Sequence, residues 1–226
     1  MKKAILICMV LVATLAQGSF AQKKKKMTET SSKDTLIQIT TDLGTMKLKL
    51  YKETPLHRAN FIKLASEGFY DSLLFHRVIK GFMIQGGDPK SKNASPGQPL
   101  GAGDVGYKIP AELVDTLFHK KGVLAAARDG NPEKASSGCQ FYIVQGKPMT
   151  ASEIEQAEQR MGFKMTETQK QAYMTIGGSP WLDRNYTVFG EVIEGLDVID
   201  KIGDVKTLPG DRPEQDVKMT VKVIVE

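Results

Sequence analysis

The stretch Phe75-His-Arg-Val-Ile-Lys-Gly-Phe-Met-Ile-Gln-Gly-Gly-Asp88 decides the fold. Two short apolar runs flank Lys80-Gly81, a pair typical of a turn, so the segment predicts a β-hairpin. A hairpin buried in a core explains the apolar residues. It leaves Gly86-Gly87 unexplained, because glycine weakens a strand unless a backbone or a ligand approaches closely.

The polar residues of this hairpin need a separate reason. Arg77 and Gln85 stand among apolar neighbours, and buried polar groups require hydrogen-bond partners. From simple alternation along the chain we do not expect Arg77, Met83 and Gln85 to share one face. A core hairpin therefore accounts for only part of the motif.

Strand and helix signals extend on both sides of the hairpin. Residues 36–39 and 46–50 alternate in polarity around a turn at 42–44 and predict two strands with one buried face. A helix is expected next, with Thr54 as its N-cap, Pro55 at its first position and Gly68 at its end.

Short strand-like runs with frequent glycines fill the rest of the chain, and a second short helix is expected at 196–202. The runs are 73–79, 82–85, 123–127, 140–144, 186–192 and 217–225. Many short strands and few helices indicate a mainly β sandwich or closed barrel. The absence of alternating strand and helix signals argues against a doubly wound sheet.

Residues 150–175 differ from their surroundings because they are rich in Glu, Gln, Met and Ala. Thr150-Ala-Ser-Glu153 and Thr166-Glu-Thr-Gln169 both match capping boxes. We interpret the segment as a helical hairpin inserted between two strands.

The N-terminus has the layout of a secretory signal peptide over residues 1–21. Lys2 and Lys3 precede an apolar run over 4–16, and Ser19-Phe20-Ala21 fits a cleavage site. The run is short for a membrane span, which needs about 20 residues, although an uncleaved anchor is the alternative. We expect secretion across the inner membrane, a periplasmic location and no stable membrane insertion after cleavage.

Residues 22–34 form a Lys-rich segment that we interpret as a flexible leader before a domain over 35–226. The net charge of the chain is +5, but without Lys2, Lys3 and Lys23–Lys26 the 25 basic and 26 acidic residues leave −1. The folded domain therefore lacks a basic excess, and no nucleic-acid partner is expected. Contact of the lysine block with anionic lipid or nucleic acid is the alternative to a solvated linker.

Several familiar chemistries lack support. Gly101-Ala-Gly-Asp-Val-Gly106 matches a dinucleotide pattern literally, but prolines before it and an extended segment after it replace the required strand and helix. His57, His76 and His119 have no metal-ligand spacing, and no GxSxG nucleophile motif occurs. Cys139 is left unpaired by signal cleavage, and its apolar neighbours predict burial.

The hairpin motif closely resembles the signature of the cyclophilins, which reads roughly FHRxIxGFMxQGGD. Further blocks match in the same order, and the resemblance covers about 35–226 with an interruption at 147–179. These blocks are Ile109–Glu112, Gly122–Arg128, Ser136–Val144, Trp181–Asp183 and Val188–Val192.

The resemblance implies a closed eight-stranded antiparallel barrel capped by two helices, and a peptidyl-prolyl cis-trans isomerase without metal or cofactor. It implies that Arg77 is catalytic and that Gln85 supports it. The residues implied to bind substrate are Phe82, Met83, Tyr142 and Leu182 in the proline pocket, Ala127, Arg128 and Gln140 along the substrate backbone, Trp181 at the rim and Tyr186 in the aromatic wall.

The sequence departs from the family pattern at several of these positions. Tyr142 replaces the usual Phe, Tyr186 the usual His, and Arg128 an Asn common in eukaryotic members. Aromatic character is kept at the first two, so the pocket is expected to survive. The insertion ends just before Trp181, and we favour decoration of the barrel over extension of the peptide site.

The resemblance also implies partners. Proline-containing polypeptides are the expected substrates, exported proteins among them, and Trp181 implies binding of cyclosporin-type inhibitors. We expect a monomer. The alternatives are a barrel that binds peptides without turnover, which the intact Arg77, Phe82, Met83 and Gln85 argue against, and an envelope adhesion protein.

Overall fold

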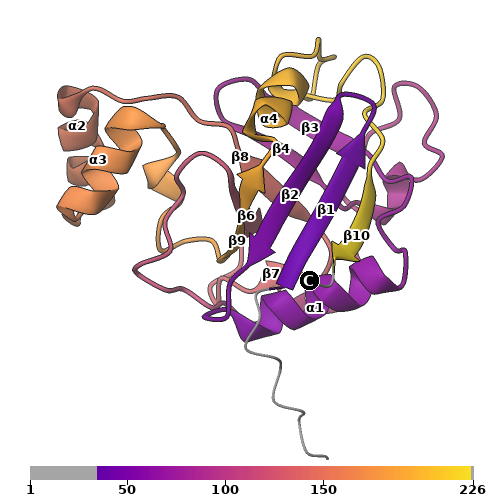
Figure 1. Ribbon diagram of the computed structural model, residues 1–226, viewed down its shortest axis with the longest axis horizontal. Helices are drawn as coiled ribbons and strands as arrows, with labels where there is room; N and C mark the ends of the chain where they lie inside the picture. Colours follow the sequence, from indigo (N-terminus) through magenta and orange to yellow (C-terminus); the bar gives the residue numbers. More distant parts are fainter. Residues whose placement is uncertain (1–34, 225–226) are drawn as a thin grey trace, which may run out of the picture. The chain divides into compact units, whose positions relative to one another are not determined.

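The computed structural model describes residues 35–224 (Figure 1). The expected signal peptide and the Lys-rich leader lie outside the described residues. Within them, no helix is both long enough and apolar enough to cross a membrane.

The fold is mainly β, as expected. Its strands are β1 (Thr35–Thr41), β2 (Gly44–Leu50), β3 (Phe75–Ile79), β4 (Met83–Gly86), β5 (Lys108–Ile109), β6 (Val123–Ala126), β7 (Ser136–Ser137), β8 (Phe141–Val144), β9 (Val188–Glu194) and β10 (Thr220–Ile224). Its helices are α1 (Pro55–Ser66), α2 (Ala151–Met161), α3 (Glu167–Thr175) and α4 (Leu196–Gly203), with short 3₁₀ turns η1 (Pro89–Ser91) and η2 (Pro180–Leu182).

Eight strands form one antiparallel sheet in the order β10-β1-β2-β9-β6-β8-β4-β3. The expectation of a closed barrel is wrong, because β10 and β3 are edge strands of an open, curled ladder. The two edges meet at a single bridge between Leu74 and Lys218. Beyond this bridge, the backbone N–H groups of Phe75 and Val78 donate to the carbonyls of Val217 and Asp211, so β3 contacts the segment before β10 without forming a continuous ladder with it.

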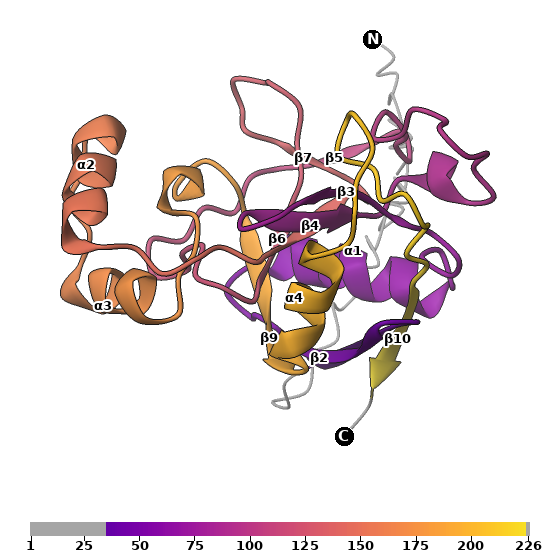
Figure 2. The ribbon, with the colours of Figure 1, turned by 90° about the horizontal axis from the view of Figure 1, so that it is seen from above.

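The main core lies inside the curled sheet, and α1 and α4 cap it from opposite ends (Figures 1 and 2). Apolar residues of α4 reach the core at helical spacing through Val198, Ile199 and Ile202. Strands β6 and β8 are buried on both faces, and β4 is buried except at Gln85. Their second face contributes to a separate apolar cluster outside the sheet, which is where the candidate site lies.

The start of α1 differs from the sequence expectation. Thr54 is at the N-cap position, but its side chain makes no capping hydrogen bond. The carboxylate of Glu112 instead accepts hydrogen bonds from the backbone N–H groups of Leu56 and His57, each at 3.0 Å. A charge from a distant loop therefore satisfies the first turn of the helix. Gly68, with φ of 66°, follows the helix as expected.

The inserted segment forms the helical hairpin that its sequence indicates. Both expected capping boxes are present, at Thr150 with Glu153 and at Thr166 with Gln169. The hairpin has a small core of its own around Ile154, Met165 and Tyr173. Figures 1 and 2 show α2 and α3 beside the sheet rather than over it.

Candidate active site

The β3–β4 hairpin brings its polar and apolar residues to one face. Arg77 pairs with Gln85, and Ile79 pairs with Met83, across the turn at Gly81. Directly paired residues of antiparallel strands point to the same side of the sheet. Alternation along the chain did not predict that Arg77, Met83 and Gln85 share one face, and the structure supplies the reason: alternation along each strand and pairing across the turn together align them.

The two glycines of the motif allow close backbone approach. A Cβ on Gly87, whose φ is +90°, would collide with the carbonyl oxygen of Cys139. A Cβ on Gly86 would meet the methyl group of Met219. Glycine is thus required at position 87, because β4 ends against the backbone of the segment before β8 and φ is positive there, whereas at position 86 the flexible Met219 side chain could move aside. Cys139 itself is buried, as expected.

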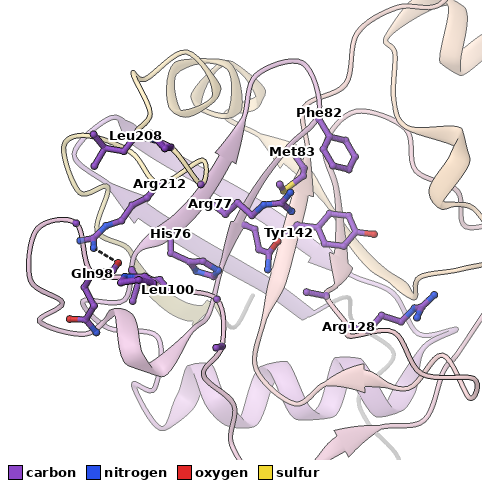
Figure 3. Close-up of a pocket in the computed structure, with 18 of the residues that line it drawn as sticks. His76, Arg77, Phe82, Met83, Gln98, Leu100, Arg128, Tyr142, Leu208 and Arg212 are labelled. Carbon is purple, nitrogen blue, oxygen red and sulfur yellow. Dashed lines mark hydrogen bonds between the residues drawn. The ribbon is translucent and has the colours of Figure 1, made fainter.

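A cleft of about 520 Å³ lies over this face of the sheet (Figure 3). Most of the sequence-predicted site residues line it, namely Arg77, Phe82, Met83, Gln85, Ala127, Arg128, Tyr142, Leu182 and Tyr186. Gln140 lines an adjoining hollow of about 620 Å³ instead. The structure therefore gathers residues that are distributed over more than 100 positions of the chain.

One end of the cleft is apolar and closely packed. Met83, Tyr142 and Leu182 are at most 9% exposed and belong to the outer apolar cluster. Phe82 lies at the edge, 5.9 Å from the ring of Trp181 between centroids. Trp181 is 50% exposed and flanks the rim from outside the cleft lining. These side chains form an apolar slot with an aromatic edge.

The hydroxyl of Tyr142 points away from the slot. It lies 3.0 Å from Nε2 of the buried His119. Burial, followed by the neighbouring Tyr186 and Asp183, raises the pKa of Tyr142 well above its usual value, so the hydroxyl keeps its proton. The replacement of the family's Phe by Tyr thus leaves the surface of the slot apolar.

The other end of the cleft is polar, and Arg77 is the residue of the polar end that lies nearest the apolar slot. Figure 3 shows its guanidinium directed toward Met83 and Tyr142. The side chain is 42% exposed, and Nε donates to Asp211 Oδ2 at 3.3 Å. Among residues 35–224 this is its one hydrogen bond. Most guanidinium N–H donors therefore stay available to a ligand.

Gln85 makes its hydrogen bond with another glutamine and not with Arg77. Its Nε2 donates to Gln140 Oε1 at 3.0 Å, and Gln140 Nε2 donates to the carbonyl oxygens of Gly101 and Gly103 at 3.0 and 2.7 Å. The glycine-rich stretch that mimics a nucleotide motif is thus a loop held against the cleft. Whether Gln85 also supports Arg77 stays a prediction.

His76 forms part of the polar end below this loop. It is 3% exposed, and within the described chain neither ring nitrogen has a hydrogen-bond partner. Its pKa is lowered to about 4, mainly by burial; Asp88 opposes the shift, and the charges of Arg77 and Arg212 contribute to it. The imidazole is therefore neutral at physiological pH.

These features match those of known proteins. The family model for "Cyclophilin type peptidyl-prolyl cis-trans isomerase/CLD" matches residues 36–223. The chain belongs to this family. It is a peptidyl-prolyl cis-trans isomerase.

Relatives with that activity in their names include a Staphylococcus saprophyticus protein, 34% identical over 88% of this chain and 96% of its own length. A Staphylococcus aureus protein is 35% identical over 78% of this chain and 85% of its own. A Streptococcus pyogenes bifunctional phosphatase/isomerase is 38% identical over 80% of this chain, which matches only 37% of that longer protein.

A crystal structure of a Cryptosporidium parvum cyclophilin-type isomerase has the same fold. Its TM-score is 0.63 at 21% identity, and the match covers 86% of this chain and 99% of that one. This likeness supports the cyclophilin fold.

Ala127 and Arg128, which the resemblance assigns to the substrate backbone, differ in whether their own backbone groups are free to bind a ligand. Ala127 uses its backbone internally, because its N–H donates to Gln140 and its carbonyl accepts from Ser137. The backbone of Arg128 has no such partner within residues 35–224. Its side chain is held by the carbonyls of Asn185 and Asp129, and its guanidinium lies 4.7 Å from the Tyr186 ring centroid. Arg128 therefore offers its backbone, and Tyr186 forms part of the wall.

Sequence reasoning missed one wall of the cyclophilin cleft. Leu208, Pro209 and Gly210 line it, and Val78 N–H donates to the carbonyl of Asp211 at 2.8 Å. The buried Arg212 anchors the same loop to the carbonyls of Ser95 and Gln98. Local sequence gives little indication that this loop lies beside the cleft. The charged pair Asp211-Arg212 between Gly210 and Pro213 is, however, typical of a structured turn.

Proposed function

We propose that the chain accelerates rotation about X–Pro bonds with Arg77 as its catalytic residue. The observation that carries this proposal is the position of a half-exposed guanidinium at the mouth of an apolar slot. The slot receives the proline ring, and the guanidinium lies beside the amide that rotates.

The chemistry requires no covalent bond to the enzyme. Rotation about an X–Pro amide is slow because it disrupts resonance, at a barrier of about 18–20 kcal/mol. A catalyst must bind the twisted amide more tightly than either planar form. In the twisted state the proline nitrogen regains its lone pair and becomes a hydrogen-bond acceptor.

Arg77 supplies the matching donor. Its charge is permanent and its donors are forked, so it can reach the proline nitrogen or the neighbouring carbonyl. Met83, Tyr142 and Leu182 grip the ring and exclude water, which strengthens the hydrogen bond. The free backbone of Arg128 is placed to hold the substrate chain beside the slot.

A protease-coupled or NMR assay with a proline peptide tests the proposal on the purified protein. We expect catalysed exchange together with binding of an Ala-Pro dipeptide in the cleft, since a related Cryptosporidium parvum cyclophilin was crystallised in the presence of that dipeptide. Dipeptide binding without faster isomerisation would instead indicate a binding module without turnover.

We also propose that the substrates are exported proteins in the periplasm of a bacterium. The support is the N-terminal order of Lys2-Lys3, an apolar run over 4–16 and small residues at 19–21. Cell fractionation of the full chain beside a form lacking residues 1–21 tests this. Both forms remaining in the cytoplasm would contradict it.

Cyclosporin binding and a monomeric state are parts of the same proposal. The half-exposed ring of Trp181 stands beside Phe82, where it can contact a large ligand that fills the slot. Calorimetry at micromolar cyclosporin and light scattering of the free protein measure the two properties. Calorimetry that shows no heat of binding would contradict cyclosporin binding. Light scattering that gives the mass of a dimer would contradict the monomeric state.

A further inference from the structure

A buried series of hydrogen bonds connects the inserted hairpin to the proline slot. Tyr173 of α3 donates from its hydroxyl to Asp183 Oδ2 at 2.7 Å. Asp183 Oδ1 lies 2.8 Å from His119 Nδ1, and His119 Nε2 lies 3.0 Å from the hydroxyl of Tyr142. Tyr142 lines the slot, so four side chains join α3 to the substrate site.

The donors and acceptors of this series agree in direction. A carboxylate only accepts, so His119 Nδ1 carries the proton toward Asp183. Nε2, on the opposite side of the ring, is then left to accept from the Tyr142 hydroxyl. Burial raises the pKa of Tyr173, and Asp183 raises it further, so this hydroxyl stays protonated as well. Each polar atom in the series is therefore satisfied.

Burial makes the series sensitive to the loss of one member. Tyr173 and His119 are fully buried, and Asp183 is 3% exposed. Oδ1 of Asp183 also accepts from the backbone N–H of His119 at 2.8 Å, whereas Tyr173 is the one donor to Oδ2 within residues 35–224. Without that hydroxyl a buried carboxylate oxygen has no partner, which favours displacement of the carboxylate and of the imidazole bound to it.

The base of the hairpin is held tightly at the same place. Gly178 bridges to both Lys120 and Lys147, and a Cβ on it would collide with the carbonyl oxygen of His119 and with the Tyr173 ring. Ser179 N–H donates to that carbonyl at 2.8 Å. The hairpin therefore cannot move without moving His119 and the turn that places Leu182.

We infer that Tyr173 is a positioning residue, through which the inserted hairpin fixes the wall of the proline slot by way of Asp183, His119 and Tyr142. This inference rests on the proposed function of the slot. It gives the insertion a role that neither decoration of the fold nor extension of the peptide groove would provide.

The test begins with Tyr173→Phe, which removes one hydroxyl and keeps the ring in the hairpin core. We expect kcat/KM for a proline peptide to fall about five-fold. The ¹⁵N signals of the His119 ring should shift in the same variant, because the Asp183 carboxylate that fixes its tautomer is perturbed.

Glu158→Gln is the matched control within the hairpin. Glu158 is a buried carboxylate that accepts from Lys164 and from the Met165 backbone and pairs with Lys170 at 3.5 Å. None of its hydrogen bonds or ion pairs within residues 35–224 involves the series. We expect it to lower hairpin stability and to leave kcat/KM and the His119 signals unchanged. If Glu158→Gln lowers kcat/KM as much as Tyr173→Phe does, the inference is overturned. Loss of hairpin stability would then explain the lower activity of both variants.

A double-mutant cycle with Tyr142→Phe tests the connection itself. The double variant should be no less active than the more impaired single variant, since Tyr142→Phe already removes the bond to His119. Additive losses would overturn the inference while leaving the isomerase assignment intact. An inactive wild-type protein would refute the proposed function, and the His119 signals would still decide whether Tyr173 acts on this network.

Discussion

The two ends of the cleft differ in how completely the protein satisfies them. At the apolar end Met83, Tyr142 and Leu182 are buried, and even the Tyr142 hydroxyl has a partner in His119. At the polar end Arg77 is half-exposed with a single long hydrogen bond, and the His76 ring has none within the described residues.

This difference indicates which end of the cleft can gain new hydrogen bonds when a ligand binds. The apolar end is already formed without a ligand, so on the proposed mechanism we expect it to provide uniform binding of the proline ring. The polar end has unused donors, and a twisted amide can satisfy them better than a planar one. Selective stabilisation of the transition state is therefore expected at the polar end.

Arg77→Ala tests this comparison most strongly. We expect kcat/KM to fall about 100-fold, because a charged donor to the twisted amide is lost, while the free energy of unfolding changes little at this half-exposed position. Isomerase kinetics and chemical denaturation measure the two quantities. Arg77→Lys should recover only part of the activity, and full turnover in Arg77→Ala would refute the mechanism.

The second prediction concerns His76 and acid. The pKa of His76 is about 4 in the folded protein and about 6.5 in the unfolded chain. The unfolded chain therefore binds the proton first as pH falls, and stability present above pH 6.5 is lost toward pH 4. We expect the free energy of unfolding to drop by about 2 kcal/mol between pH 7 and pH 5.

Urea denaturation across this pH range measures the effect. His76→Asn should lose most of the dependence. We expect any remaining pH dependence to come from His57. Burial lowers the pKa of His57 as well, and Glu112 opposes that shift. An NMR titration of His76 in the intact protein provides a direct check, and an ordinary pKa there would show that the polar end is hydrated.

Phe82→Ala tests the apolar end. Phe82 contributes the edge of the slot beside Trp181, so its loss should weaken binding of the ring in planar and twisted states alike. We expect KM to rise about ten-fold with a nearly constant kcat. Ile193→Ala, at an exposed apolar residue that does not line the cleft, is the control. A fall in kcat alone would reverse the roles assigned to the two ends.

Asp211→Asn should have the smallest effect. The carboxylate lies 3.3 Å from Arg77 Nε and both side chains are over 40% exposed, so the pair contributes little energy. We expect kcat to fall about three-fold as the guanidinium becomes less ordered. Asp204→Asn, which breaks the more exposed pair with Lys80, is the control. Equal kinetics in both variants would show that Arg77 needs no support from this loop.

The sequence alone determined the local features of the molecule. The turn at Gly81, the two capping boxes of the inserted hairpin and the strand pattern depend on residues a few positions apart, and the structure confirms them. Local sequence predicts such features because their hydrogen bonds form between near neighbours. The roles of the motif residues Arg77 and Gln85, in contrast, were predicted only from the family resemblance.

Tertiary structure alone decided which distant groups meet. Glu112 caps α1 from a position 55 residues away in the sequence. Asp211 accepts a hydrogen bond from Arg77 although the two residues are 134 positions apart. The open edge between β3 and β10, and the path from Tyr173 to Tyr142, likewise depend on how the sheet curls and where the hairpin docks. No local pattern encodes these contacts, because packing of the whole chain sets the distance between segments that are far apart in sequence.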